Sequence, residues 1–370
     1  MTRFAHITGW GMSVPSRIVT NEDLSRIVDT TDEWIRTRSG IRQRHIAGSR
    51  DSTATLAVDA SLKALAVAGI PAHQIGLVIV ATSLPEHYFP STACIVQDQI
   101  GAMNASAFDL LAACSGFIYG LSVASQMIIG GGVDNALVIG SETMSRLLNW
   151  NDRSTCVLFG DGAGAVILQA SDRPGGVLST SLHADGSGSD LLMIPAGGSH
   201  LPTSAETVEK NQHTIIMNGR EVYRFATRVM ASSTREAVEK AGLSLSDIDL
   251  IIPHQANQRI IESAAKELAL PLDRFVINVD RYGNTSAASI PIAICEAMEA
   301  GRIQPGSHIV FVAFGAGLTW ASAVVKWTTT GVRKPRRLSW ADWLFARLRS
   351  IARRTRRRIE GWIWGGKIEE

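Results

Sequence analysis

Cysteine is scarce in this chain. Its 370 residues contain four, none of them in a CxxC pair or a Cys/His ligand spacing: Cys94, Cys114, Cys156 and Cys295. This scarcity argues against a disulfide framework and a bound metal, and it fits a reducing compartment such as the cytoplasm. Long apolar runs are also missing, so we expect no transmembrane helix. The N-terminal residues lack the apolar stretch of a signal peptide.

Charge is distributed unevenly. The whole chain has a net charge of +2, but residues 328–370 contain 12 Lys or Arg and 4 Asp or Glu, a net of +8. The body that precedes them therefore carries a net of −6 and is followed by a strongly basic extension. With 45% apolar and 19% charged residues, the chain has the composition of a globular protein with a large core.

One pattern of helix, turn and strand occurs twice. Ala68-Gly69-Ile70 and Ala241-Gly242-Leu243 each follow an amphipathic helical stretch and precede a β-branched strand. A further helix, strand, turn and helix follow in each half, and then an apolar strand, at 136–139 and at 309–312. Continuous apolar strands predict sheets that are buried on both faces. The sequence therefore predicts a duplicated α/β fold, with halves at residues 1–170 and 171–327.

Cys114 lies where an apolar strand over 107–111 turns into a helical pattern that begins at Phe117. A thiol near a helix N-terminus is favoured as thiolate by the helix dipole and the free N–H groups. A strand-to-helix turn also exposes one side chain, as nucleophile elbows do. The alternative is a small buried core cysteine.

Two other polar residues fall at related places. His254 ends the strand 250–253, and Asn284 lies 42 residues after Gly242, nearly the 45 that separate Cys114 from Gly69. We therefore expect the turns at Cys114 and Asn284 to face each other. A thiolate can accept an acyl group from a thioester, and two neutral N–H donors can stabilise an enolate. Without a carboxylate base, these groups favour a carbanion formed by loss of carbon dioxide.

The segment Phe314-Gly315-Ala316-Gly317 follows what we take to be the last core strand of the second half. Its backbone N–H groups, with that of Cys114, could form an oxyanion hole for an acyl-cysteine carbonyl. An ordinary tight turn is the alternative.

Six motifs in the same order resemble β-ketoacyl-[acyl-carrier-protein] synthase III, a thiolase-like family, over about residues 4–327. They are DTTDEWI at 29–35, SGIRQRH at 39–45, ACSGF at 113–117, FGDGAGA at 159–165, PHQAN at 253–257 and GNTSAAS at 283–289. The resemblance implies a homodimer whose subunit has a layered αβαβα core. It also implies condensation of an acyl-CoA starter, typically acetyl-CoA, with malonyl-acyl carrier protein to initiate type II fatty acid synthesis. Cys114 would be the nucleophile, and His254 and Asn284 would support decarboxylation and the enolate.

The same resemblance implies binding residues. Trp34 and Arg153 would sandwich the adenine of coenzyme A, and Arg38 would meet its phosphates. Asn257 and Arg259 would line the tunnel or the carrier-protein surface. Phe89 would cap the acyl pocket of the partner subunit, and Met144 and Phe159 would line the pocket behind Cys114. No cofactor is implied, because the coenzyme A thioester and the phosphopantetheine of the carrier protein are substrates. The alternative is a specialised ketosynthase or acyltransferase of the same fold, with another starter or a CoA-bound extender.

Rival classes fit less well. The glycines at 160, 162 and 164 lack the spacing of a dinucleotide loop. A papain-like hydrolase would have its cysteine near the mature N-terminus in a different motif. A thiolase would need a second cysteine, which Gly315-Ala316-Gly317 does not supply.

The family does not account for residues 328–370. Within 339–364, apolar residues recur at helical spacing opposite many arginines. Such a helix could lie on an anionic membrane, attract the acidic carrier protein or nucleic acid, or remain a solvated extension. We expect no nucleic acid partner and keep peripheral membrane contact as one alternative.

Overall fold

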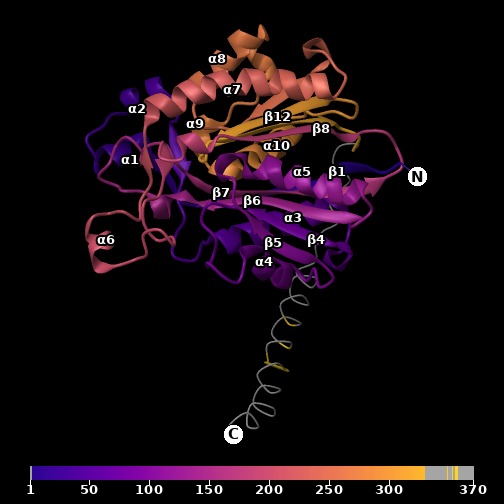
Figure 1. The fold of residues 1–370 in the computed structure, drawn as a ribbon, viewed down its shortest axis with the longest axis horizontal. Helices are drawn as coiled ribbons and strands as arrows, with labels where there is room; N and C mark the ends of the chain where they lie inside the picture. The colour runs from indigo at the N-terminus through magenta and orange to yellow at the C-terminus, as the bar shows by residue number, and fades with distance from the viewer. Residues whose placement is uncertain (1, 330–347, 349–351, 353–354, 357–370) are drawn as a thin grey trace.

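Two β-sheets and the helices around them form the body of the protein, as the computed structural model shows (Figure 1). The structure describes residues 2–329 together with Leu348, Ala352, Thr355 and Arg356. These last four residues are helical and exposed, and the rest of the predicted amphipathic segment 339–364 lies outside the described residues.

The first sheet has the strand order β1-β7-β6-β4-β5. Strands β6, β4 and β5 are parallel, whereas β7 pairs antiparallel with both β6 and β1. All five residues of β4 are buried, which confirms the prediction from its continuous apolar sequence. The strands are β1 (Phe4–Ser13), β4 (Leu77–Ala81), β5 (Ser106–Leu110), β6 (Asn135–Thr143) and β7 (Asp161–Ser171).

The second sheet has the order β11-β12-β13-β8. Here β11 and β12 are parallel, and β13 pairs antiparallel with β12 and β8. Its strands are β8 (Gly176–Ala184), β11 (Leu250–Pro253), β12 (His308–Gly315) and β13 (Thr319–Lys326). Short strand pairs outside the two sheets are β2 (Ile18–Thr20) with β3 (Gln43–His45) and β9 (Leu192–Met193) with β10 (Ile216–Met217).

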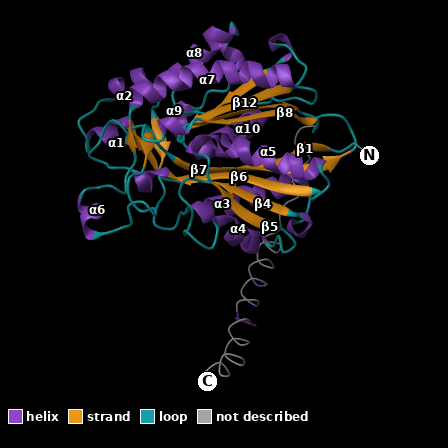
Figure 2. Ribbon diagram, viewed as in Figure 1, coloured by secondary structure: helices purple, strands orange, loops and turns teal. Residues whose placement is uncertain are grey.

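Helices separate and cover the sheets in five layers (Figure 2). Helices α5 (Gly116–Ile129) and α10 (Ser289–Glu299) lie between the two sheets. Helices α3 (Thr53–Ala68) and α4 (Thr92–Ile100) cover the outer face of the first sheet, and α7 (Gly219–Lys240) and α8 (Gln258–Leu268) cover that of the second. This arrangement is the predicted αβαβα fold. The remaining helices are α1 (Asn21–Ser25), α2 (Asp32–Ser39), α6 (Ala205–Glu209) and α9 (Val279–Tyr282).

Local sequence explains where the helices begin and end. Ser52 caps α3 by accepting from the Thr55 N–H, and Gly69 ends it with φ 71°. Asn257 caps α8 by accepting from the Arg259 N–H. These caps satisfy backbone groups that a helix end leaves without partners, so the ends are fixed by sequence.

The internal repeat is confirmed, but its register differs from our expectation at the site. A 3₁₀ turn precedes the central helix of each half: η2 (Ala113–Ser115) before α5, and η7 (Ser286–Ala288) before α10. Ala113 and Ser286, the first residues of these turns, have φ 46° and 49°. The counterpart of Cys114 is therefore Ala287, and Asn284 lies three residues earlier. The two turns do contact each other.

Two predictions about strands need correction: the strand expected just before Asn284, and the strand expected to come last in each half. In the second half the structure describes no strand between α8 and Asn284: Phe275 forms only an isolated bridge with Ile251, and α9 follows it. The strands at 136–139 and 309–312 are also not the last in their halves. Antiparallel β7 and β13 follow them, so Gly315-Ala316-Gly317 connects β12 to β13.

Among the described residues, no helix is long and apolar enough to cross a membrane. Within the same residues, no group of three or more His, Cys, Asp or Glu side chains could hold a metal ion.

Candidate active site

Cys114 is held at the turn between β5 and α5. The turn is tight because Ala113 adopts the left-handed conformation, which is rare for residues other than glycine. The backbone of Gly315 packs directly against it: a Cβ at Gly315 would lie 2.7 Å from the Cys114 backbone nitrogen. Any side chain at 315 would displace the turn, so glycine is required here.

The ionisation state of Cys114 differs from the prediction. Burial raises the pKa of this thiol to about 12, and the charge of Glu142 acts in the same direction. A hydrogen bond with Ser286 opposes the rise without cancelling it. The helix N-terminus is present as predicted, but Cys114 is only 7% exposed, and desolvation is the largest cause of the raised pKa. The free protein therefore holds Cys114 as a thiol.

His254 follows β11 and extends its pairing, because its backbone N–H donates to the Val312 carbonyl. Burial lowers the pKa of the imidazole to about 3, so the ring is neutral at physiological pH. Its Nδ1 lies 2.7 Å from the Ser289 hydroxyl, while its buried Nε2 has no hydrogen-bond partner. With Ser289 donating to Nδ1, Nε2 carries the hydrogen and is free to donate to a ligand.

Asn284 is fixed by its own turn. Its side-chain Oδ1 accepts from the Ser286 N–H at 2.8 Å, which identifies the oxygen and leaves the NH₂ group as a donor. Its backbone N–H donates to the Leu158 carbonyl, and its carbonyl accepts from the Gly160 N–H. The segment Leu158–Gly160 of the first half thus positions Asn284 of the second.

One cavity brings the three predicted residues together. Cys114, His254 and Asn284 all line it, and its volume is about 670 Å³ including solvent at its mouth. Its other walls are mainly apolar and come largely from α7, α8 and the segments before them. They include Phe159, Leu192, Met217, Val222, Tyr223, Ala256, Asn257, Ile260, Phe314, Gly315 and Leu318. Phe159 lines the cavity as expected. Met144 does not, because it is buried in a neighbouring apolar cluster beside Phe159.

The turn after β12 contributes Gly315 to the cavity. Ala316 lies outside the left-handed region that Ala113 and Ser286 occupy, so its methyl group is tolerated. Its carbonyl accepts from the Thr319 hydroxyl, which fixes the turn.

The residues expected to hold coenzyme A form a cluster on the surface. The guanidinium groups of Arg38 and Arg153 lie 5.0 Å and 5.2 Å from the centre of the Trp34 ring. A sandwiched adenine would need about 7 Å, twice a contact distance of ~3.5 Å. Arg153, which also donates to the Asp29 carbonyl, must therefore move away before a ring enters.

Asn257 connects that cluster to the cavity. It lines the cavity, and its Nδ2 donates to the Arg38 carbonyl at 2.9 Å. Arg259, the next residue but one, lies 5.6 Å above the ring of Tyr223, another lining residue. Phe89 lies apart from these residues, with 87% of it exposed on the surface.

Two residues of the site had no predicted role. Glu142, at the end of β6, is fully buried, and Ser286 Oγ donates to its carboxylate at 2.9 Å. The signal for Glu142 was an acidic residue three positions after the apolar run 136–139, a place where a charge is costly unless it has a function. Ser286 lay inside the motif at 283–289, but nothing in the sequence gives its contacts.

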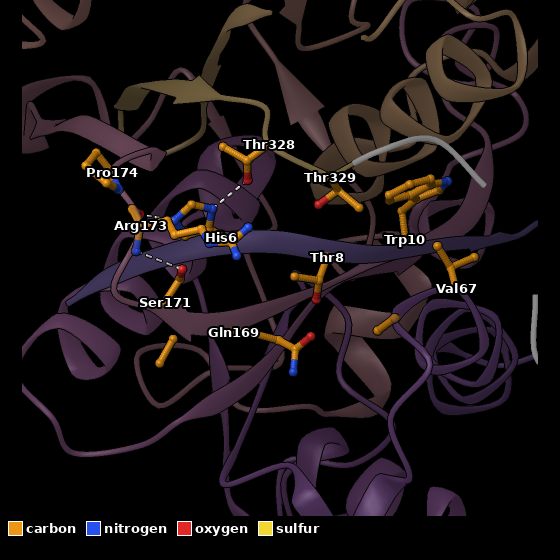
Figure 3. A pocket seen from close by; sticks show the side chains of 12 residues that line it. His6, Thr8, Trp10, Val67, Gln169, Ser171, Arg173, Pro174, Thr328 and Thr329 are labelled. Atoms are coloured by element: carbon orange, nitrogen blue, oxygen red, sulfur yellow. Dashed lines mark hydrogen bonds between the residues drawn. The ribbon is translucent and has the colours of Figure 1, made fainter. Parts of the chain in front are cut away.

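A second cavity lies away from these residues (Figure 3). His6, Thr8 and Trp10 of β1 line it together with the end of β7 and Thr328. His6 Nδ1 is hydrogen-bonded to the Thr328 hydroxyl at 2.5 Å, so residues just after the second sheet contact β1 at this cavity.

Comparisons with known proteins show to which class of enzymes the chain belongs. A family model described as 3-oxoacyl-[acyl-carrier-protein] synthase III matches residues 108–186, and one described as the C terminal of the same enzyme matches residues 238–327. The β-ketoacyl-[acyl-carrier-protein] synthase III of Roseiflexus castenholzii is 55% identical over 89% of this chain and 99% of that protein. The fold and the site thus define a thiolase-like condensing enzyme, an acyltransferase.

Solved structures agree. The crystal structure of 3-oxoacyl-[acyl-carrier-protein] synthase III from Aquifex aeolicus has a TM-score of 0.82 and 44% identity, over 87% of this chain and all of that one. The priming β-ketosynthase of the R1128 polyketide pathway has the same TM-score at 35% identity, over 89% of this chain and 97% of that one. The chain belongs to the β-ketoacyl-[acyl-carrier-protein] synthase III family.

Proposed function

We propose that the protein condenses an acyl-CoA starter, typically acetyl-CoA, with malonyl-[acyl-carrier-protein]. The products are 3-oxoacyl-[acyl-carrier-protein], carbon dioxide and CoA, and the reaction initiates type II fatty acid synthesis. The observation that carries this proposal is the cavity in which Cys114 lies with two neutral N–H donors, His254 and Asn284. Membership of the family supports the same reaction.

In the first step Cys114 attacks the thioester carbonyl of the acyl-CoA. A C–S bond to Cys114 forms, the bond to the CoA sulfur breaks, and CoA leaves as a thiolate that takes a proton from solvent. The backbone N–H groups of Cys114 and Ala316 are proposed to stabilise the oxyanion of this step. Gly315 places the two segments in contact, which supports that assignment.

In the second step malonyl-[acyl-carrier-protein] loses carbon dioxide. The electron pair of the broken C–C bond forms an enolate, whose oxygen accepts from His254 Nε2 and the Asn284 NH₂ group. The neutral imidazole supports this role, because a donor that is not charged needs no counter-ion in a buried site. The enolate carbon then attacks the acyl-Cys114 carbonyl and releases the Cys114 thiolate.

We propose that both thioesters enter along the apolar cavity wall and past Asn257. Trp34, Arg38 and Arg153 would bind the nucleotide part of CoA after Arg153 moves, and Arg259 would contact the carrier protein or the tunnel. No cofactor is needed, since each substrate brings its own activated thioester.

A homodimer is also part of the proposal. Strand β5 is an edge of the first sheet, and it and the segments beside it expose large apolar side chains. Phe89 is 87% exposed, Leu111 77% and Phe108 37%. An unpaired edge strand with such a surface is favourable only when another surface covers it, and a second copy of the chain fits this requirement. Phe89 would then reach the acyl pocket of the partner.

The nucleophile is tested by intact-mass analysis after exposure to a panel of acyl-CoAs. We expect one acyl adduct on the protein and none on Cys114→Ala. Cys94→Ala is the matched control, because Cys94 is an exposed cysteine outside the cavity and its loss should leave the adduct unchanged. If no acyl-CoA gives an adduct with the unmodified protein, the proposed function is wrong.

The alternative is a specialised ketosynthase with another starter or a CoA-bound extender, which the 35% identity to a polyketide priming ketosynthase keeps open. The same panel separates the two. Preference for acetyl-CoA with malonyl-carrier protein supports the proposed initiation of fatty acid synthesis. Preference for a longer starter or for malonyl-CoA supports the specialised ketosynthase.

The basic extension carries a separate proposal. The relatives are covered almost whole by 89% of this chain, and the matched family model ends at residue 327. We propose a cytoplasmic enzyme whose residues 339–364 contact an anionic membrane surface through arginines and aromatic residues. Co-sedimentation with anionic liposomes should be lost in a chain that ends at Thr328. Equal binding by both chains would contradict membrane contact.

A further inference from the structure

Two backbone segments must lie side by side if the proposed oxyanion hole is to form. The turn before α5 carries the N–H of Cys114, and the turn between β12 and β13 carries that of Ala316. Both N–H groups must lie about 2.7–3.1 Å from the position of the oxyanion. Among the described residues, no backbone hydrogen bond uses the Ala316 N–H, so this donor is available for an oxygen.

One hydroxyl group joins these two segments. Thr319 is the first residue of β13, and its Oγ1 lies 3.0 Å from the Ala316 carbonyl oxygen on its own turn. On the other segment, the same atom lies 2.6 Å from Ser115 Oγ and 3.1 Å from the Ala112 carbonyl oxygen. Ser115 Oγ in turn lies 2.8 Å from the Ala112 carbonyl oxygen. We call these four hydrogen bonds the hydroxyl link.

The hydrogens of the two hydroxyl groups allow only arrangements that join the segments. Ser115 and Thr319 each have one hydroxyl hydrogen, and at 2.6 Å one hydroxyl must donate to the other. If Ser115 donates, Thr319 has its own hydrogen for one of the two carbonyls. If Thr319 donates, Ser115 donates to the Ala112 carbonyl. A hydrogen bond between the two turns is therefore present in both cases.

Both ends of the hydroxyl link are held by the surrounding structure. The backbone of Thr319 pairs with Gly315 of β12 on one side and with Ala184 of β8 on the other. Its methyl group packs beside Gly317, where an added Cβ would lie 2.8 Å from Thr319 Cγ2. Ser115, at the other end, is fully buried. Side chains held in this way can fix a catalytic group to within about 0.5 Å, the precision that such a group needs.

We propose that Thr319 is a positioning residue of the oxyanion hole. Gly315 sets the closest approach of the two segments, because a Cβ there would lie 2.7 Å from the Cys114 nitrogen. Thr319 keeps the segments from separating, so that the N–H groups of Cys114 and Ala316 reach the same oxygen. This inference rests on the proposed function of Cys114 as nucleophile. It adds that acylation depends on a hydroxyl group that does not line the cavity.

The test is the single-turnover rate of acetylation by saturating acetyl-CoA, followed by quenched-flow intact mass at pH 7. Thr319→Val has nearly the shape of threonine but lacks the hydroxyl. We expect its rate to fall by about 10- to 100-fold, because a small displacement of a catalytic group has an effect of this size. The acetyl-CoA concentration that gives half the maximal rate should change little, since the cavity walls are untouched. Thr319→Ser keeps the hydroxyl and should retain most of the rate.

Two further rates show whether the rest of the site is intact. Alkylation of Cys114 by iodoacetamide forms no oxyanion, so its rate, measured by peptide mapping, should be the same in Thr319→Val as in the unmodified protein. Loss of carbon dioxide from malonyl-[acyl-carrier-protein] uses His254 and Asn284 in the proposed reaction, and its rate should also be unchanged. A general loss of structure would instead lower all three rates together.

Thr180→Val is the matched control. Thr180 of β8 forms another hydroxyl pair with α5, since its Oγ1 lies 2.9 Å from Ser122 Oγ. This pair also joins α5 to the second sheet, but neither residue lines the cavity or lies in the two turns. Thr180→Val should therefore leave the rate of acetylation unchanged.

Ser115→Ala tests the other end of the hydroxyl link, and we expect it to slow acetylation as well. Both substitutions break the same connection, so the double variant Ser115→Ala, Thr319→Val should be little slower than Thr319→Val alone. If the two effects multiply in the double variant, the hydroxyl groups act independently and the inference is wrong.

The outcomes separate this inference from the proposed function. Equal rates of acetylation in Thr319→Val and the unmodified protein would overturn the inference and leave the proposed function standing. The same conclusion would follow if alkylation or decarboxylation fell as much as acetylation, if Thr180→Val lost as much activity, or if Thr319→Ser did. Failure of every acyl-CoA to acylate Cys114 in the unmodified protein would instead remove the proposed function itself.

Discussion

The turns before α5 and before α10 have the same backbone and different chemistry. Each is a 3₁₀ turn whose first residue has a φ near 50°, at Ala113 and at Ser286, and each leads into a helix between the two sheets. The first turn presents Cys114, whereas the equivalent residue of the second is Ala287. The second supplies Ser286 and, just before it, Asn284. The two halves thus have equivalent turns in contact, and their different residues divide the proposed roles of nucleophile and donors between them.

The sharpest way to break this comparison is to move the thiol. We expect the double variant Cys114→Ala, Ala287→Cys to give no acyl adduct. Ala287 has the backbone of Cys114, but it does not line the cavity that holds His254 and Asn284. Intact mass after exposure to acetyl-CoA measures the result, with Ala287→Cys alone as the control that the added sulfur is tolerated. An adduct on the double variant, mapped to the thiol introduced in the second turn, would contradict this prediction. It would show that acetyl-CoA reaches a thiol in either turn.

A second prediction separates the donors from the nucleophile. His254→Ala should still acquire an acetyl group on Cys114 but should lose decarboxylation of malonyl-[acyl-carrier-protein] by about 100- to 1000-fold, the usual cost of one oxyanion donor. Carbon dioxide release and intact mass measure the two steps separately. Normal decarboxylation in this variant would show that His254 has another role.

The smallest expected effect concerns stability and pH. His254 has a folded pKa of about 3 and an unfolded value near 6.5, so the folded state binds the proton less well than the unfolded state. Above pH 6.5 His254 therefore does not change the free energy of unfolding. As the pH falls from 6.5 toward 3, His254 lowers that free energy by at most about 1.4 kcal/mol per pH unit. Urea unfolding at pH 7 and pH 5 measures it. His254→Asn should lose less stability over that interval than the unmodified protein, and an equal loss would contradict the buried neutral imidazole.

Much of this site could be predicted from the sequence because its elements are local. The apolar run of β4, the cap at Ser52 and the turn at Cys114 are each defined by a few neighbouring residues, and the repeat predicted that two turns would meet. The register of that repeat was wrong by three residues. Spacing from Gly242 does not reveal that α9 and a single bridge at Phe275 replace a strand.

Contacts between distant segments could not be predicted in this way. Trp34 and the arginines beside it were expected to leave room for an adenine ring. In the structure these side chains pack against each other instead, and the Arg153 guanidinium lies 5.2 Å from the centre of the Trp34 ring. Glu142 and Ser286 are 144 residues apart, and nothing in either local sequence indicates that they share a hydrogen bond.

The sequence by itself determined the fold class and the duplication, and it singled out Cys114, His254 and Asn284 as the proposed site, because periodicity and motifs are carried by short stretches. Only the tertiary structure decided the protonation of those groups. The helix N-terminus at Cys114 favours a thiolate, but the thiol is buried in the packed molecule, and this burial raises its pKa to about 12. Burial is a property of the whole packed molecule, so it also decided that His254 is neutral and that the pKa of Glu142 is raised to about 7.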